Sequence, residues 1–489
     1  MNNTELIVFI VYFIFMIAIG LYFFLKNRSG GEKAYFLGNR QVNGLIAALS
    51  AGASDMSSWV LMGLPASIFV AGLGKVWIAV GLAIGTVLSW IFVAPRLRSF
   101  SIVANDSITL PQYLTNRFLS KSKILQVICA ILFIVVYAIY AASSIKACGT
   151  LFNTVIGIEA KTAMYIAAAI IIVYTFLGGF SAVCWTDFFQ GLLMLIALML
   201  APIVGMVVIR NGGGVAATDV VENFWNPLPS GRFDWTSISS IITGLGWGLG
   251  YFGMPHIIIR YMAIKSPAAL KRSRVIGSIW TCLILVFSVA VALVGKNLVG
   301  DLDDSSVVFI TMVRKLFPAV VSGILLSAIL AASMSTADSQ LLASASAFAS
   351  DVYRPIIHKN ASNKEMMWVG RIIVILVSIA ALLIAANPNS GTIMSLVENA
   401  WGLFGAAFGP VILLSLYWKR FSFVGAVASI LVGAIVDALW LIFLSGSTGV
   451  YEIVPGFICG LLAGYIFSKC SKATPEAMEL YDTGVAYDK

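Results

Sequence analysis

The sequence predicts an all-α protein that crosses a membrane many times. Of its 489 residues, 60% are hydrophobic and only 11% are charged, whereas a soluble chain carries about 25% charged residues. Its mean hydropathy is +0.96. Because a spanning helix needs about 20 apolar residues, this composition is enough for about a dozen spans. We therefore expect the lipid bilayer to surround most of the chain.

Thirteen apolar runs predict thirteen transmembrane helices. The first run follows Glu5 and precedes Lys26 and Arg28. A signal peptide would be shorter, with positive charge in front of it, so we expect this helix to be retained. The predicted spans are 6–25, 43–71, 74–95, 125–147, 161–180, 188–209, 237–259, 275–298, 317–348, 369–387, 394–417, 422–444 and 452–468.

The basic residues predict how these spans are oriented. When Lys and Arg are assigned to alternating sides of the membrane, 23 of the 31 fall on one side. By the positive-inside rule that side is cytoplasmic. We expect a multi-pass plasma-membrane protein with its N-terminus outside and its C-terminus in the cytoplasm. The net charge of +9 is scattered over short loops, so no nucleic-acid partner is expected.

No hydrophilic segment is long enough to form a soluble domain. We expect one transporter domain over residues 1–470 and a short solvated cytoplasmic tail over 471–489. The six cysteines are isolated and the chain has two histidines, so we expect neither a metal cluster nor an enzyme. No obligatory protein partner is evident. Within the domain we distinguish the first helix with its loop (1–42), two repeats (43–209 and 237–417) and the last two helices (422–470).

Two of the predicted spans are poor helices by composition. Residues 49–65 read LSAGASDMSSWVLMGLP, and residues 244–255 read GLGWGLGYFGMP. Glycine and proline weaken helices, and backbone groups freed in a membrane must face protein or a wet cavity. The two broken spans begin five-helix units, spans 2–6 and 7–11, of inverted topology. Such matching breaks indicate a transporter's binding site, although glycines also allow close helix packing.

Five segments resemble the sodium/solute symporter family, and within it the sodium/proline symporter branch. They are LSAGASDMSSWVLMGLPASIFVAG, GGFSAVCWTDFFQG, GWGLGYFGMPHIIIRYMA, LLSAILAASMSTADSQLL and WGLFGAAFGPVILLSLYW. The resemblance runs over essentially the whole chain. It implies a LeuT-type core of inverted repeats and sodium-coupled symport of L-proline by alternating access. Alternatives left open are another solute (pantothenate, a sugar acid or another amino acid), coupling to protons, and a transporter-like solute sensor.

A cation site is predicted where the ninth span faces the broken second span. Ala332, Ser335 and Thr336 share one helix face because their spacing is i, i+3, i+4. Their hydroxyl and carbonyl oxygens are hard ligands, and the unwound second span adds the carbonyls of Ala53 and Met56. The family resemblance implies that these five positions hold the coupling ion, Na⁺. The alternative is that the two hydroxyls bond back to their own helix.

Acidic residues near this site are further candidates. Asp55 lies at bilayer depth, where an ionisable residue indicates function; the alternative is that it caps the helix after the break. We expect Asp187 and Asp338 near span ends on the cytoplasmic side, in solvated or capping positions. The resemblance implies that Asp187 matters for sodium. Asp55 and Asp187 are therefore accessory candidates for the sodium site.

The substrate site is predicted beside the two breaks. Helix N-termini at a break supply donors for a carboxylate, and Ser57 can add a hydrogen bond. Trp247 and Tyr251, spaced i, i+4, present aromatic surface on one face. Anchoring at the membrane interface or simple packing is the alternative role for aromatic residues. The resemblance implies Ser57, Trp247, Tyr251 and Pro255 as proline-binding positions, and we add Trp59 and Tyr140 as secondary candidates.

Overall fold

The computed structural model describes residues 3–26, 32–177, 179–215 and 220–487. Across these ranges the regular structure is helical, apart from one isolated parallel bridge between Val42 and Ile264. The helices of the first half are α1 (Asn3–Lys26), α2 (Glu32–Leu37), α3 (Gly44–Asp55), α4 (Gly63–Ala71), α5 (Val76–Leu88), α6 (Ala94–Val103), α7 (Leu110–Arg117), α8 (Ile124–Ile156), α9 (Ala160–Leu177) and α10 (Phe180–Val208).

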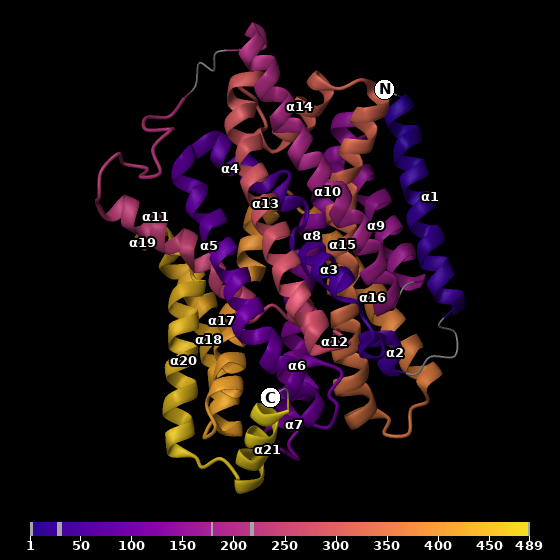
Figure 1. Cartoon of the computed structure of the whole chain (residues 1–489), viewed down its shortest axis with the longest axis vertical. Coiled ribbons are helices and arrows are strands. Elements are labelled where there is room, and N and C mark those ends of the chain that lie inside the picture. Colours follow the sequence, from indigo (N-terminus) through magenta and orange to yellow (C-terminus); the bar gives the residue numbers. More distant parts are fainter. Residues whose placement is uncertain (1–2, 27–31, 178, 216–219, 488–489) are drawn as a thin grey trace.

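The second half continues the same bundle, whose long axis is vertical in Figure 1. Its helices are α11 (Trp235–Gly246), α12 (Pro255–Ala263), α13 (Pro267–Val299), α14 (Val308–Leu316), α15 (Ala319–Phe348), α16 (Asn363–Ala386), α17 (Ile393–Tyr417), α18 (Phe423–Phe443), α19 (Ser445–Thr448), α20 (Ile453–Cys470) and α21 (Pro475–Ala486). The start of α1 and the C-terminal helix α21 lie toward opposite ends of the bundle (Figure 1).

The structure confirms an all-helical protein with many membrane spans. In the described ranges, ten helical segments are long and apolar enough to cross a membrane, and a bent pair, Gly44–Asp55 with Ser58–Ala71, makes an eleventh. The other two predicted spans correspond to α9, whose apolar helix is shorter, and to the segment divided between α11 and α12. The count of thirteen stays a prediction.

Burial separates the inner helices from those that face lipid. The most apolar 18-residue windows of α15 and α17 are 78% buried, whereas that of α1 is 22% buried and that of α18 is 28% buried. Large apolar side chains such as Ile14 and Ile442 are more than half exposed. Water would disfavour so much exposed apolar surface. The outer helices therefore present their apolar faces to the bilayer, and α15 lies at the centre.

The second predicted span is broken in the middle. Its first half, α3, ends at Asp55, and Met56 (φ −79°, ψ 75°) leaves the helical conformation. Ser57 is extended, and its side chain accepts a hydrogen bond from the backbone N–H of Trp59 to begin the short helix η2 (Ser58–Val60). The two halves of the span meet at 71°.

The seventh predicted span is also interrupted. Between α11 and α12 the chain tightens into η6 (Trp247–Phe252), and Met254 is extended before Pro255 begins α12. Proline suits the first turn of a helix because backbone N–H groups in that turn have no intrahelical acceptor. The glycines also allow helices to pack closely here. The carbonyl oxygen of Gly81 lies 2.4 Å from the position that a Cβ on Gly248 would occupy.

The sequence predicted a solvated C-terminal tail, whereas the structure has a packed helix there. Residues Pro475–Ala486 form α21, which packs on the end of the bundle. The ring of Tyr481 lies 5.3 Å from that of Phe100, and the buried Arg117 donates a hydrogen bond of 2.9 Å to the Ala477 carbonyl. The boundaries proposed for the two repeats remain predictions.

Candidate functional site

The two elements predicted to hold a cation meet at the centre of the bundle. Ser335 on α15 donates to the carbonyl of Ala53 on α3 at 2.7 Å, and its Oγ also lies 3.2 Å from the carbonyl of Ala332. All three residues are buried. Ala53 lies in the last turn of α3, where carbonyls lose their helical partners. Ser335 thus bonds across to the unwound span as well as back onto its own helix.

The two other predicted ligands, Thr336 and Met56, lie close in sequence to the residues that form this contact. Thr336 follows Ser335 on α15, and its buried hydroxyl has no hydrogen-bond partner in the described part of the chain. Met56 is fully buried and is the first residue after α3. The structure therefore brings Ala53, Ala332 and Ser335 into direct contact, with Thr336 and Met56 next to them along the chain.

Asp55 connects the two broken spans. The hydroxyl of Tyr251, in η6, donates to one carboxylate oxygen of Asp55. The other oxygen is buried without a partner among the described residues. The alternative that Asp55 caps the helix after the break is wrong, because Ser57 fills that position. A buried carboxylate with a free oxygen, next to carbonyls at a helix end that lack intrahelical partners, makes this region strongly attractive to a cation.

Aromatic rings surround the same centre. Trp247 and Trp59 have ring centroids 6.3 Å apart, and the indole of Trp59 donates to the Asp55 carbonyl at 3.2 Å. Two rings that sequence reasoning missed complete the group. Trp401 donates to the Trp247 carbonyl at 2.8 Å, and Tyr451 lies 5.2 Å from the Trp247 ring. Trp401 heads one of the five motif segments, so its signal was present in the sequence.

The remaining substrate candidates lie close by. Ser57 and Pro255 are buried at the two breaks, and the buried hydroxyl of Tyr140 lies near the side chains of Ser57 and Trp59. His256 was missed. It follows Pro255, and its Nε2 lies 3.1 Å from the Ser54 carbonyl. It thereby ties α12 to the end of α3.

Asp187 and Asp338 are not in solvated positions at span ends, contrary to expectation. Both side chains are fully buried, Asp187 on α10 and Asp338 on α15. Asp187 accepts from Ser50 at 2.6 Å and pairs with Arg260 at 3.2 Å. Burying two carboxylates without a cation would be costly. Arg260 follows the predicted end of the seventh span at residue 259, which placed it in a loop. It is instead their buried counter-charge on α12.

A hydrogen-bond path joins this ion pair to the predicted cation ligands. Arg260 donates to Ser339 at 2.6 Å, and Ser339 donates to the carbonyl of Ser335 at 2.8 Å. One oxygen each of Asp187 and Asp338 has no partner in the described ranges. Arg260 lies within the motif segment GWGLGYFGMPHIIIRYMA, and a charge there was the available signal.

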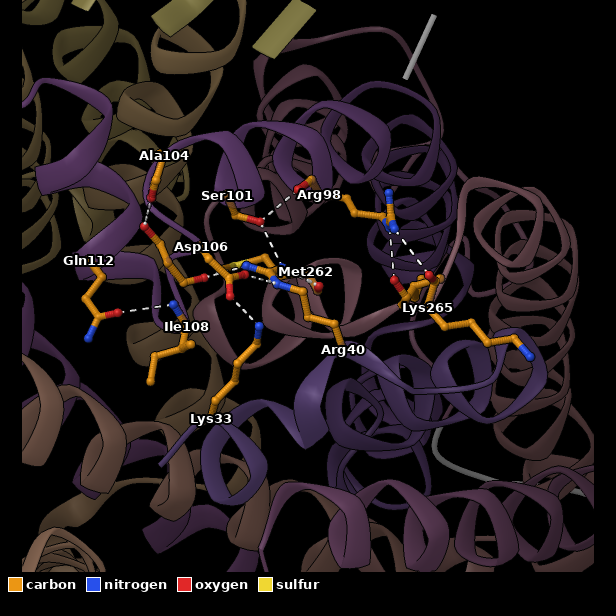
Figure 2. Close-up of polar contacts among 12 residues, drawn as sticks. Lys33, Arg40, Arg98, Ser101, Ala104, Asp106, Ile108, Gln112, Met262 and Lys265 are labelled. Carbon is orange, nitrogen blue, oxygen red and sulfur yellow. Dashed lines mark hydrogen bonds and ion pairs between the residues drawn. The ribbon is translucent and has the colours of Figure 1, made fainter. Parts of the chain in front are cut away.

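A second polar cluster fastens the other ends of both broken spans (Figure 2). Asp106 accepts hydrogen bonds from Lys33 and, at 2.8 Å, from Arg40. Arg40 also donates to the Met262 carbonyl at 2.6 Å. Arg98 donates to the Ile264 carbonyl at 2.9 Å. We call these four side chains, Lys33, Arg40, Arg98 and Asp106, the clamp, because they tie the chain before α3 to the last turn of α12 and the residue that follows it.

The charge state of Asp106 depends on these partners. Partial burial works to raise the pKa of Asp106, but hydrogen bonds from Lys33 and Arg40 outweigh burial and hold that pKa below its ordinary value. Asp106 therefore stays ionised at neutral pH. Burial lowers the pKa of Arg40, and its bonds to Asp106 oppose that shift.

The centre is closed, and a cavity lies to one side of it. Trp59, Trp247 and Tyr251 are each 1% exposed. A cavity of about 250 Å³ is bordered by Thr243 and Gly244 of α11, about one turn before Trp247. The clamp lies beyond α12, at the other end of the same broken span. The centre therefore has a cavity toward one end and a polar cluster toward the other.

These features define a class of protein. A polytopic membrane protein with two broken helices meeting at a buried polar and aromatic centre has the architecture of a secondary transporter. The chain belongs to the sodium:solute symporter family, whose sequence pattern matches residues 35–433.

Relatives and solved structures agree with this membership. The chain is 43% identical to the osmoregulated proline transporter OpuE of Bacillus subtilis, over 96% of this chain and 95% of that protein. It is 42% identical to the sodium/proline symporter of Escherichia coli, over 98% and 95%. A substrate-bound, outward-open Na⁺-coupled sialic acid symporter shares the fold, with a TM-score of 0.77, 21% identity and coverage of 96% of this chain and 99% of that one.

Proposed function

We propose that this protein takes up L-proline across the plasma membrane together with sodium. The observation that carries the proposal is identity of 42–43%, over nearly the full chain, to relatives named as proline transporters and sodium/proline symporters. The buried centre supports it, because it combines hard oxygens suited to a small cation with an aromatic enclosure suited to an apolar ring. The protein acts as a transporter, not as an enzyme.

The proposed sodium ligands are Ala53, Met56, Ala332, Ser335 and Thr336. The support is the contact of Ser335 with the Ala53 carbonyl at 2.7 Å, in a place where α3 has just ended. A sodium ion there would take the place of the Ser335 hydroxyl hydrogen as the partner of the Ala53 and Ala332 carbonyl oxygens. The ion would thus bridge α3 and α15. Asp55 and Asp187 are proposed to supply negative field without ligating the ion directly.

The proposed proline site adjoins the sodium site. Ser57 and the N-terminus of η2 would donate to the carboxylate, and Trp247 and Tyr251 would enclose the ring together with Trp59. Proline's cationic nitrogen would lie close to an aromatic face, a favourable arrangement. Pro255 shapes the wall by beginning α12 directly after the break, and Tyr140 is a secondary candidate. Because Tyr251 also donates to Asp55, the two proposed sites share a residue.

Shared residues provide the coupling. If sodium orders the unwound segment and proline binds the ordered form, each ligand raises the affinity for the other. With the proposed orientation, N-terminus outside and C-terminus cytoplasmic, the clamp faces the cytoplasm and must open for release. The proposed thirteen spans and inverted five-helix repeats would supply the rocking motion. One charge moving through 100 mV contributes about 2.3 kcal/mol, enough for a roughly fifty-fold proline gradient.

Uptake of labelled proline into vesicles tests the proposal. We expect accumulation driven by an inward sodium gradient and unaffected by a proton gradient of the same size. Proline uptake that does not depend on the sodium gradient would contradict the proposed coupling to sodium. Saturable sodium-driven uptake of pantothenate, a sugar acid or another amino acid in place of proline would reassign the substrate. Tight proline binding without any uptake would favour a solute sensor.

A further inference from the structure

A basic cavity lies where the last membrane helix ends. It has a volume of about 300 Å³, and its lining includes Trp418, Arg420, Ser471, Lys469, Lys472 and Met478. Met478 belongs to α21, so the C-terminal helix forms one wall. The cavity is separate from the transport centre, whose residues Trp59, Trp247 and Trp401 lie on η2, η6 and α17.

The cations of this cavity differ from their neighbour Lys419 in their ion pairing within the described residues. In the ranges that the structure describes, no acidic side chain forms an ion pair with Arg420, Lys469 or Lys472, although the neighbouring Lys419 pairs with Asp482. Lys469 lies 5.5 Å from the ring of Tyr465, a contact that leaves its N–H donors available. Three positive charges around one hollow form a site that attracts an anion.

The surface beside the cavity is apolar and faces lipid. Ile458, Leu462 and Tyr465 of α20 are 51%, 54% and 50% exposed, and their spacing of four and three residues places them on one helix face. Lys469 continues that face four residues later. The ring of Tyr465 stacks on Trp418 at 5.1 Å, an aromatic pair of the kind found at the membrane–water boundary.

We propose that this cavity binds the phosphate headgroup of an anionic phospholipid. The acyl chains would lie along the exposed face of α20, and the phosphate would contact Arg420, Lys469 and Lys472. Basic pockets between membrane helices recognise anionic lipid headgroups in this way. The apolar strip that leads into the cavity favours a lipid over a free phosphate ion, because a free ion gains nothing from it. Since α21 forms one wall, the lipid would also hold the C-terminal helix in place.

Native mass spectrometry of the purified protein tests the proposal, with phosphatidylglycerol added in detergent. We expect one retained lipid in the unsubstituted protein. Arg420→Gln, Lys469→Gln and Lys472→Gln combined should weaken retention about 100-fold, because each basic residue near an anionic membrane contributes about fivefold. The matched control, Lys121→Gln, Arg272→Gln and Lys359→Gln combined, removes the same charge from exposed residues elsewhere and should retain the lipid.

Two further arms identify the source of the anion. Phosphatidylcholine, whose headgroup is neutral overall, should be retained far less than phosphatidylglycerol. Inorganic phosphate at the same concentration should neither bind nor displace the lipid. Equal losses in the two triple variants would overturn the proposal, since they would mean diffuse charge attraction. Displacement by inorganic phosphate would overturn the lipid assignment. If the triple variant fails to fold, the single Lys472→Gln, beyond the end of α20, should still weaken retention about fivefold.

Discussion

Ser335 shows how one hydroxyl can serve two helices. Its Oγ lies within hydrogen-bonding distance of a carbonyl on its own helix and of the Ala53 carbonyl at the end of α3. Thr336 beside it has a buried hydroxyl with no partner in the described chain. An unsatisfied buried hydroxyl costs free energy, so this position is expected to have a functional reason.

We predict that Ser335→Ala and Thr336→Val each raise the sodium concentration for half-maximal proline uptake about tenfold. The reason is the loss of one oxygen ligand, worth about 1.5 kcal/mol for a bond to a charged partner. Sodium titration of uptake measures it. Ser327→Ala is the control, because Ser327 bonds only one turn back on α15, to Gly323 at 2.8 Å. An unchanged sodium requirement in both variants would show the ligand assignment to be wrong.

We predict that Tyr251→Phe weakens apparent proline affinity at least tenfold. This change removes the donor to Asp55 and leaves a buried carboxylate short of one hydrogen bond, a loss of about 1.5–3 kcal/mol. The dependence of uptake on proline concentration measures it. The control is Tyr261→Phe, an equally buried tyrosine whose hydroxyl bonds to Ser89 at 3.2 Å, whereas the hydrogen bond to Asp55 comes from Tyr251. Equal effects of the two changes would indicate a general loss of packing.

At the scale of elements, the broken spans are held at one end by the clamp. Arg40, 8% exposed, bonds to Asp106 and to the end of α12, and Val42 pairs with Ile264 in the structure's isolated bridge. Opening a path at this end requires these contacts to separate. The strength of the clamp should therefore set how often the end opens.

We predict that Asp106→Asn makes Cys184 react up to about fivefold faster with a thiol reagent. Cys184 is 1% exposed and lies one turn before Asp187 on α10, close to Ser50 of α3 and Arg260 of α12. Along their helices, both of these residues lie between the centre and the clamp. A partly exposed ion pair contributes up to about 1 kcal/mol, which limits the effect. Peptide-resolved mass spectrometry separates Cys184 from the other cysteines. Asp482→Asn breaks an exposed ion pair outside the clamp and should leave the rate unchanged.

The clamp should also lose strength in acid. Because the pKa of Asp106 is lowered in the folded protein, its stabilising contribution is complete above the ordinary carboxylate pKa of about 4. It is lost as the pH falls through the lowered value. We therefore predict that Asp106→Asn lowers the melting temperature at pH 7 and that this difference shrinks below about pH 4. A difference that is constant from pH 7 to pH 3.5 would contradict the assigned partners.

At the scale of the whole molecule, the basic residues serve two purposes. When the loops are assigned to alternating sides of the membrane, most Lys and Arg residues fall on one side. This asymmetry predicts the orientation of the protein in the membrane. Yet Arg40, Arg98, Arg117 and Arg260 are buried, with exposures of 8%, 7%, 0% and 2%. These arginines fasten helix ends and neutralise carboxylates as well as contributing to the charge asymmetry.

Labelling of the native Cys470 can test the membrane orientation of the protein without an added reporter group. It is the one cysteine classed as exposed in the described chain, and it ends α20. We predict that a membrane-impermeant maleimide labels Cys470 in inside-out vesicles and not in right-side-out vesicles. Cys470→Ser should abolish the labelling. Labelling only in right-side-out vesicles would reverse the proposed orientation of the C-terminus.

Much of this architecture could be predicted from the sequence, because its causes are local. Apolar runs of about 20 residues determine that the chain crosses a membrane, and Gly, Pro and Ser clusters determine where two of those helices break. The residues named beforehand at the breaks, among them Ala53, Ser57 and Tyr251, lie at the centre for that reason. Helix periodicity placed Ala332, Ser335 and Thr336 on one face.

Only the tertiary structure decided which distant groups meet. Burial of Asp187 requires Arg260, 73 residues away, and no local pattern distinguishes that pairing from a charge at a loop boundary. The same holds for Trp401 beside Trp247, for the clamp across α2, α6 and α12, and for the docking of α21. Local sequence determines where a helix forms and ends, because those energies are local. Which charges neutralise each other depends on long-range packing, because a buried charge is stabilised only by whichever partner the fold brings to it.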